Sequence, residues 1–238
     1  MVKEEIMSTP AKVMTFRTLV RTIIIVAAFP LIPMIISGDW AWWEAWIYAL
    51  VSILGFVISR VLAARQHPDL LEERARSMDL KDAKPWDKLL APILAFGALF
   101  ILIVAGLDRL FGWTLPFTVN IKIVALIVII LGYLLGSWAL IENRFFSGVV
   151  RIQKDRGHRV VSTGPYRFIR HPGYSGALWA YLATPVLLDS LWAFIPAFLL
   201  VGVLILRTAL EDRTLQQELP GYKEFTEKTR FRLIPGLW

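Results

Sequence analysis

The chain has 238 residues, of which 56% are hydrophobic, and 26 Lys and Arg residues outnumber 19 Asp and Glu residues. The apolar excess is typical of a protein in lipid, so the net charge of +7 indicates membrane surfaces rather than nucleic acid. Cysteine is absent, which excludes disulfides, thiolate metal sites and cysteine nucleophiles. His67, His158 and His171 are widely separated, and no metal site is predicted.

Six apolar segments follow one another along the chain. The first four are long enough for membrane-spanning helices, which need about 20 residues. The last two are shorter and are separated by Asp189 and Ser190, so we predict a tight helical hairpin. The predicted fold is all-α: a polytopic membrane protein with about six transmembrane helices. The segments are 19–37, 43–64, 89–107, 121–141, 174–188 and 191–206.

The distribution of basic residues predicts the orientation in the membrane. If both termini are cytoplasmic, only Arg109 and Lys122 of the 26 Lys and Arg residues fall on the opposite side. We therefore expect an integral membrane protein, in the plasma or inner membrane if prokaryotic, with its polar face toward the cytoplasm. The opposite side should carry an interfacial belt of tryptophans, namely Trp40, Trp42, Trp43, Trp113 and Trp192.

Two features of the N-terminal part concern packing. The charged loop 65–88 predicts an amphipathic helix at the membrane interface. In the fourth apolar segment Gly132 and Gly136 form a GxxxG pair, which lets two helix backbones approach closely. Helix packing is the favoured interpretation of this pair, and a border with a cofactor is the alternative.

The densest polar sequence, NRFFSGVVRIQKDRGHRVVSTGPYRFIRHPGY, covers residues 143–174. Its TGPY and HPGY parts are turn signals, because glycine adopts backbone angles that other residues avoid and proline fixes its own. HPGY also suits the start of a helix, with Pro172 in the first turn. Arg167 and Arg170 are expected to be cytoplasmic anchors. His171 adds little to the charge balance and is a candidate site residue.

Arg207 and Glu211 lie where the last apolar segment ends. Their spacing of four residues places both side chains on one face of a helix. An exposed pair in this order would contribute less than about 0.5 kcal/mol. Ionisable groups beside a membrane span are costly and are usually functional, so we predict a functional role for the pair.

Three parts of the C-terminal sequence together resemble the isoprenylcysteine carboxyl methyltransferase family, here as a bacterial-type relative. They are GHRVVSTGPYRFIRHPGYSG, the Arg207 and Glu211 pair, and the ELPGYKEF and RLIPG motifs. The resemblance implies methyl transfer from S-adenosylmethionine, with S-adenosylhomocysteine as product, to a lipophilic acceptor that enters from the bilayer. We expect one membrane domain over 1–238, with four spans in 19–141 and a methyltransferase-like region with a cytoplasmic cofactor site in 142–238.

The positions matched by the resemblance imply that Arg207 contacts the acceptor and that Glu211 contacts the cofactor. Both residues are predicted to be catalytic. A glutamine of the family corresponds to Gln153, with Arg151 as the alternative. The other implied cofactor-binding residues are His158, Arg159, Val160, Val161, Tyr166, His171, Pro172, Gly173 and Tyr174.

The chemistry of these residue types agrees with the implied cofactor. His171 and nearby backbone N–H groups can bind the carboxylate of the cofactor. Tyr166 or Tyr174 can stack on its adenine. Glu211 can accept hydrogen bonds from its ribose hydroxyls or its ammonium group. The permanently charged Arg207 can orient an anionic acceptor such as a carboxylate. If the acceptor is an amine or a thiol, a proton must leave, and Glu211 is the nearest candidate base.

The acceptor itself stays open at this stage. An isoprenylcysteine carboxylate is the first candidate, as in a protein-S-isoprenylcysteine O-methyltransferase, and a phospholipid amine or a small thiol is the alternative. The expected partners are a lipophilic or lipidated acceptor and membrane lipids, with no nucleic acid and no obligate protein partner. A transporter component or a non-catalytic membrane scaffold is the alternative from another class, although the apolar segments carry no charges at mid-span.

Overall fold

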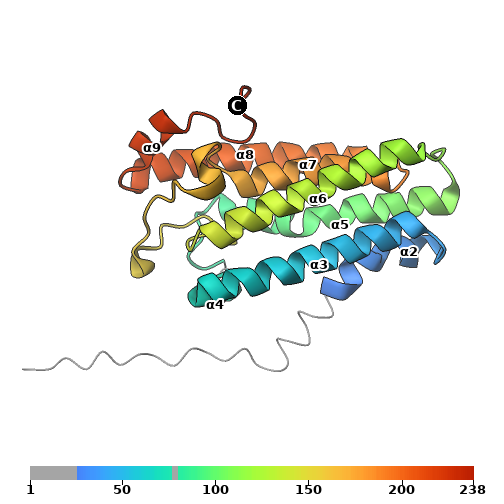
Figure 1. Ribbon diagram of the computed structural model, residues 1–238, viewed down its shortest axis with the longest axis horizontal. Helices are drawn as coiled ribbons and strands as arrows, with labels where there is room; N and C mark the ends of the chain where they lie inside the picture. The colour runs from blue at the N-terminus through green and yellow to red at the C-terminus, as the bar shows by residue number, and fades with distance from the viewer. Residues whose placement is uncertain (1–25, 77–79) are drawn as a thin grey trace, which may run out of the picture.

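The computed structural model describes residues 26–76 and 80–238, and helices are the only regular elements within these residues. The long helices run side by side as an elongated bundle (Figure 1). The elements are η1 (Phe29–Leu31), α2 (Ile32–Ser37), α3 (Trp43–Gln66), α4 (Pro68–Arg76), α5 (Asp87–Phe111), α6 (Val119–Glu142), η3 (Lys154–Arg156), η4 (Gly164–Arg167), α7 (Pro172–Leu187), α8 (Phe194–Glu218) and α9 (Tyr222–Lys228).

Four of these helices, α3, α5, α6 and α8, are long and apolar enough to cross a membrane. The all-α fold and the integral membrane character are therefore confirmed. The first predicted span, 19–37, lies partly outside the described residues, which contain a short apolar helix over Val26–Ser37. Six spans and the cytoplasmic location of both termini stay predictions.

The last two apolar segments differ from the predicted hairpin of short helices. Helix α7 has 16 residues, but α8 has 25 and continues from its apolar part through Arg207 to Glu218. The polar turns of α8 remain helical because their side chains have partners inside the protein, and both Arg207 and Asp212 are buried. The prediction of a short second helix is therefore wrong.

Helices α6 and α7 pack most extensively against each other. At their crossing, a Cβ atom on Gly132 would lie 2.5 Å from the carbonyl oxygen of Gly176, so neither position has room for a side chain. A Cβ atom on Gly136 would meet nothing within 4 Å. Backbone packing thus explains Gly132, whereas Gly136 faces open space.

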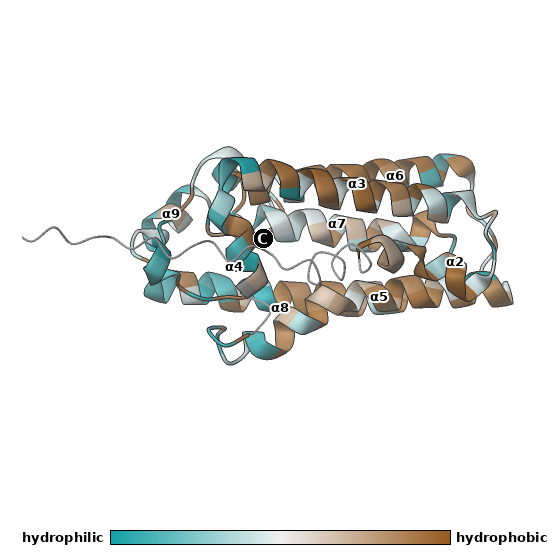
Figure 2. Cartoon of the chain, turned by 90° about the horizontal axis from the view of Figure 1, so that it is seen from below, coloured by the Kyte–Doolittle hydropathy of each residue, from teal (hydrophilic) through white to brown (hydrophobic). Residues whose placement is uncertain are grey.

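Hydrophilic residues gather at one end of the bundle, where α4 and α9 lie, while the helices between the two ends are largely hydrophobic (Figure 2). We call this the polar end, and it comprises residues 67–76, 80–86, 143–171 and 219–238. It brings together the loops that follow α3 and α6 and the segment that follows α8. Most of the candidate functional residues lie there, and the others lie on the adjoining parts of α7 and α8, namely Pro172, Gly173, Tyr174, Arg207 and Glu211.

The opposite end of the bundle contains a buried group of charges. Lys122 of α6 pairs with Glu44 of α3 and with Asp189 in the turn between α7 and α8, where Nζ and Oδ2 are 2.5 Å apart. Asp189 has a φ of 51°, a conformation that aspartate tolerates better than most residues. This group of charges joins three separate parts of the chain.

The tryptophans of this end are only partly consistent with the predicted belt. Trp40, Trp43, Trp113 and Trp192 are exposed, as a membrane interface requires. Trp42 is 1% exposed and packs in the hydrophobic core, so its assignment to the belt is wrong.

Candidate functional site

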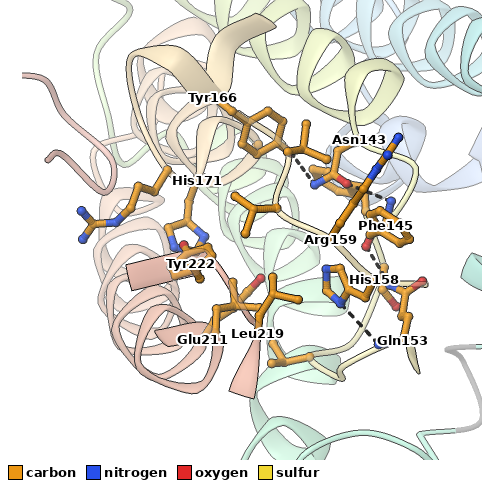
Figure 3. A pocket seen from close by; sticks show the side chains of 18 of the residues that line it. Asn143, Phe145, Gln153, His158, Arg159, Tyr166, His171, Glu211, Leu219 and Tyr222 are labelled. Atoms are coloured by element: carbon orange, nitrogen blue, oxygen red, sulfur yellow. Dashed lines mark hydrogen bonds between the residues drawn. The ribbon is translucent and has the colours of Figure 1, made fainter. Parts of the chain in front are cut away.

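A cavity at the polar end lies between the loop after α6 and helices α7, α8 and α9 (Figure 3). Its lining combines aromatic side chains with a few polar and charged groups, as is typical of small-molecule sites. Every predicted cofactor-binding residue except Pro172 lines it, and so does Arg151. These predicted residues are Gln153, His158, Arg159, Val160, Val161, Tyr166, His171, Gly173, Tyr174 and Glu211.

Helix α4 holds the loop side of the cavity in place. Glu73 of α4 is buried and accepts hydrogen bonds from Arg151 at 2.8 and 2.7 Å. Asp69, one turn earlier, accepts a hydrogen bond from Arg156 at 2.7 Å. Arg151 also donates to Asp155 at 2.8 Å, so its guanidinium is occupied by protein carboxylates. The helix predicted in the loop 65–88 is therefore present as α4, and it anchors the cavity loop.

Gln153 and His158 face each other within this loop. The Gln153 amide donates to the carbonyl oxygen of Phe145 at 2.8 Å, and its backbone N–H donates to His158 Nδ1 at 3.3 Å. The His158 ring packs on the Phe145 ring, with centroids 4.7 Å apart. Burial, followed by the positive charges of Arg151 and Arg156, lowers the pKa of His158 to about 4. His158 is therefore neutral at pH 7, and because Nδ1 accepts a hydrogen bond, Nε2 carries the proton.

The TGPY motif forms the turn η4 and brings Tyr166 to the cavity. Gly164 has a φ of 55°, and a Cβ atom there would lie 2.8 Å from the carboxylate of Glu142. Glu142 accepts a hydrogen bond from the hydroxyl of Thr163, which fixes this close approach. The Tyr166 hydroxyl accepts a hydrogen bond from Asn143 Nδ2 at 3.2 Å. Only glycine satisfies both the conformation and the space at position 164.

Asp212 of α8 is 0% exposed and organises the helix side of the cavity. Arg170 donates to both of its carboxylate oxygens, at 2.8 and 3.0 Å. His171 Nε2 lies 3.3 Å from the same carboxylate, and the Tyr222 hydroxyl donates to it at 3.1 Å. Arg232 of the C-terminal segment donates at 2.9 Å. Asp212 therefore holds His171 in position from behind.

Arg170 differs from the cytoplasmic anchor that the sequence predicted. It is 7% exposed, and besides Asp212 it binds the carbonyl oxygens of Thr229 and Arg230 at 2.9 and 2.7 Å. The positive-inside pattern could not reveal this role, because it counts charges without regard to burial. Arg167 is exposed, which is consistent with an anchor.

Arg207 and Glu211 both contact the hydroxyl of Tyr174. Arg207 Nη1 donates to this hydroxyl at 2.6 Å, and the hydroxyl donates to Glu211 Oε2 at 2.6 Å. The carboxylate that pairs with Arg207 is Asp87 at the start of α5, at 2.6 and 3.0 Å. Arg207 is 5% exposed and lies behind Tyr174, outside the lining of the cavity.

A second, larger cavity lies between the helices of the bundle. Its walls come from α3, α5, α6 and α7 and are mostly apolar, and Gly136 borders it. Phe146 and Gly173 line both cavities. The Phe146 ring packs so closely on Gly173 that an added Cβ atom would lie 2.7 Å from it. The two cavities therefore adjoin at Phe146.

Sequence reasoning missed several residues that build the site. Asp87 and Asp212 neutralise the arginines around it, and Phe145 supports His158. A signal existed for Asp87, because it is an acidic residue directly before an apolar segment and is costly there without a partner. Nothing in the local sequence indicates which arginine it would meet.

The fold and the site define a helical membrane protein with a polar cavity at one end of its bundle and an apolar cavity beside it. Residues 124–217 match the family model described as the isoprenylcysteine carboxyl methyltransferase (ICMT) family. The resemblance predicted from the motifs is thereby confirmed over this region, which is less than half of the chain.

Curated relatives match parts of the chain. A probable protein-S-isoprenylcysteine O-methyltransferase of Oryza sativa subsp. indica is 36% identical over 69 residues, which is 29% of this chain and 36% of the relative. Protein-S-isoprenylcysteine O-methyltransferase B of Arabidopsis thaliana is 39% identical over 64 residues, 26% of this chain and 32% of the relative. The Saccharomyces cerevisiae protein-S-isoprenylcysteine O-methyltransferase is 28% identical over 111 residues, 46% of this chain and 44% of the relative. The chain thus spans less than half the length of these relatives.

Proposed function

We propose that this chain is an integral membrane methyltransferase that transfers a methyl group from S-adenosylmethionine to a lipophilic acceptor. An isoprenylcysteine carboxylate is the first candidate acceptor, as the names of the relatives suggest. One observation carries the proposal: the cavity lined by the predicted cofactor residues adjoins a large apolar cavity at Phe146. A reaction between a charged donor and a membrane-soluble acceptor needs two such compartments side by side.

The residues of the polar cavity fit the groups of the proposed cofactor. Glu211 offers a carboxylate for ribose hydroxyls or an ammonium group. Neutral His158 offers an N–H donor, and Phe145 and Tyr166 offer aromatic faces for adenine. When bound, S-adenosylmethionine supplies a methyl group that its sulfonium has already activated. The protein then needs mainly to align the acceptor and to exclude water.

The hydrogen-bond chain from Asp87 to Glu211 would provide this alignment. Asp87 orients Arg207, which together with Glu211 fixes the hydroxyl of Tyr174 at the cavity wall. If the acceptor is a carboxylate, no proton has to move. If it is an amine or a thiol, Glu211 is the carboxylate in the cavity that can accept the proton.

Calorimetry with S-adenosylhomocysteine on the purified full chain in detergent tests the cofactor. We expect binding at micromolar concentrations, and Glu211→Gln should weaken it about tenfold because a charge-assisted hydrogen bond is lost. Glu218→Gln is the matched control, since Glu218 lies on the same helix but pairs with Lys84 at 2.6 Å outside the cavity. No binding to the unmutated protein, or equal losses in both variants, would contradict the proposal.

A methyl-transfer assay with labelled cofactor tests the acceptor. Prenylcysteine, phosphatidylethanolamine and a long-chain alkyl thiol represent the three candidate classes. Gly136→Leu should reduce turnover of any long-tailed acceptor, because Gly136 lines the apolar cavity and a Cβ atom there would meet nothing within 4 Å. Gly202→Leu is the control, since Gly202 also has open space around it but lies outside the cavity. If both variants behave alike, the apolar cavity does not hold the acceptor.

A further inference from the structure

Arg60 is a charged residue in the wall of the apolar cavity. It lies on α3, six residues before the last residue of that helix, Gln66, which corresponds to about 9 Å along the axis. Its guanidinium donates to the hydroxyl of Ser59 at 3.1 Å and lies over the ring of Phe56, 4.4 Å from the centroid. Both contacts orient the charge without neutralising it. Within residues 26–76 and 80–238, no carboxylate forms an ion pair with Arg60.

Three other cations, each no more than 7% exposed, have anionic partners. Lys122 pairs with Glu44 and Asp189, Arg170 pairs with Asp212, and Arg207 pairs with Asp87. A cation in an apolar environment is costly unless an anion accompanies it, and this fold supplies one in each case. Arg60 is half-buried, lines a cavity and has no such anion among residues 26–76 and 80–238. An ionisable residue of this kind inside a membrane-spanning helix indicates a binding site.

The position of Arg60 relates it to the polar cavity. Its electrostatic neighbour is Arg74 of α4. Arg74 donates to the carbonyl oxygen of Phe146 at 3.3 Å and lies over the Phe146 ring, 5.5 Å from the centroid. Phe146 lines both cavities. Arg60 therefore adds positive charge to the part of the apolar cavity that adjoins the proposed cofactor site.

We propose that Arg60 binds an anionic group of the acceptor, whose apolar tail occupies the cavity inside the bundle. The group is a carboxylate or a phosphate, because both accept paired hydrogen bonds from a guanidinium. This inference rests on the proposed function and narrows its substrate class to anionic amphiphiles. The family resemblance gives this role to Arg207, but Arg207 is neutralised by Asp87 and lines neither cavity.

Direct binding of a matched ligand series to the full chain in a non-ionic detergent tests the inference. The probes are N-acetyl-S-farnesylcysteine, its uncharged methyl ester and farnesyl phosphate. Binding of each probe is measured by the change in tryptophan fluorescence of the protein. We expect one or both anions to bind the unmutated protein about tenfold or more tighter than the ester, as charge-assisted hydrogen bonds predict. A preference for the carboxylate indicates a cysteine-type acceptor, and a preference for the phosphate indicates a lipid phosphate. Equal binding of all three probes would overturn the inference.

Variants of two arginines on the same helix sharpen this test. Arg60→Gln should remove the preference for anions, and Arg60→Lys should keep part of it. Arg65→Gln is the matched control, because Arg65 also lies near the end of α3 but is exposed and outside both cavities. An equal loss in Arg60→Gln and Arg65→Gln would assign the preference to general surface charge and would overturn the site. If Arg60→Gln does not fold, the comparison of ligands on the unmutated protein still decides the question.

The same protein samples separate this inference from the proposed function. S-adenosylhomocysteine binding, measured by calorimetry, should be unchanged in Arg60→Gln because Arg60 does not line the polar cavity. If the anion preference is present while S-adenosylhomocysteine fails to bind, the proposed function is wrong and the anion site stands. If S-adenosylhomocysteine binds but no anion preference exists, the anion site is wrong and the proposed function stands.

Discussion

Arg207 and Asp87 are 120 positions apart in sequence and form a buried pair in which two guanidinium nitrogens meet two carboxylate oxygens. The pair connects α8 to the start of α5. Asp87 also accepts a hydrogen bond from the backbone N–H of Val150 at 2.6 Å. One carboxylate therefore orients both the arginine behind Tyr174 and the loop that forms the opposite wall of the polar cavity.

Loss of this carboxylate should destabilise the protein strongly. Asp87→Ala leaves the Arg207 guanidinium buried without its anion, which costs about 3–5 kcal/mol, so the thermal midpoint in detergent should fall. Lys84→Gln is the control, because it breaks the more exposed pair with Glu218 and should cost less than about 1 kcal/mol. Similar midpoints for the two variants would show that the buried pair does not stabilise the fold.

The hydroxyl of Tyr174 should matter for cofactor binding without being needed for folding. Tyr174→Phe keeps the ring that stacks on His171, with centroids 5.8 Å apart, but removes the group between Arg207 and Glu211. We expect S-adenosylhomocysteine affinity to fall about tenfold in calorimetry, because Glu211 loses its oriented donor. Tyr181→Phe, on the same helix but outside the polar cavity, should leave the affinity unchanged. The prediction fails if the two variants bind equally well.

The two glycines of the GxxxG pair should respond differently to alanine. Gly132→Ala forces a methyl group against the Gly176 carbonyl oxygen and should cost about 1–3 kcal/mol of stability. Gly136→Ala meets no neighbouring atom and should be neutral or stabilising by about 1 kcal/mol, since alanine favours helix. Thermal unfolding of both variants in the same detergent measures the difference. Equal effects would mean that the α6 and α7 backbones do not meet at Gly132.

His158 should make stability depend on pH. Its pKa of about 4 in the folded protein lies below its usual value of 6.5, so the folded state binds fewer protons than the unfolded state. The contribution of neutral His158 is fully present above pH 6.5 and is lost as the pH falls from 6.5 toward 4. Unfolding at a series of pH values should show this loss, and His158→Gln should reduce it. A side-chain NMR titration with a midpoint near 6.5 would contradict the prediction.

The membrane helices could be predicted from the sequence to the extent that hydropathy determines them. Helices α3, α5 and α6 lie where apolar segments of about 20 residues predicted them. The end of α8 could not be predicted in this way, because the helix continues past its apolar residues. Its polar turns are stabilised by partners on distant elements, such as Asp87 for Arg207 and Arg170 for Asp212.

In the candidate site too, features set by neighbouring residues could be predicted, whereas contacts between residues far apart in sequence could not. Short motifs such as TGPY around Gly164 and HPGY around His171 fix the local backbone geometry. They could therefore be predicted from the sequence. The roles of Arg170, Arg207 and Arg60 depend on which carboxylate the fold brings near each one. Sequence shows their charge but not their burial or their partner. For this reason the prediction for Arg170 was wrong, and it could not be foreseen that Arg60 has no ion-pair partner in the part of the chain that the structure describes.

The buried group of Lys122, Glu44 and Asp189 has a consequence for the order in which the chain can assemble. Lys122 and Glu44 both precede the segment that forms the polar cavity, so their ion pair can close as soon as α6 has been synthesised and inserted. Asp189 comes 67 residues after Lys122 and joins only when the turn between α7 and α8 reaches the same end of the bundle. The first helices thus have a charge-compensated arrangement of their own while the rest of the chain is still on the ribosome. Lys122 therefore gains its second carboxylate only after α7 and the turn that follows it have been synthesised.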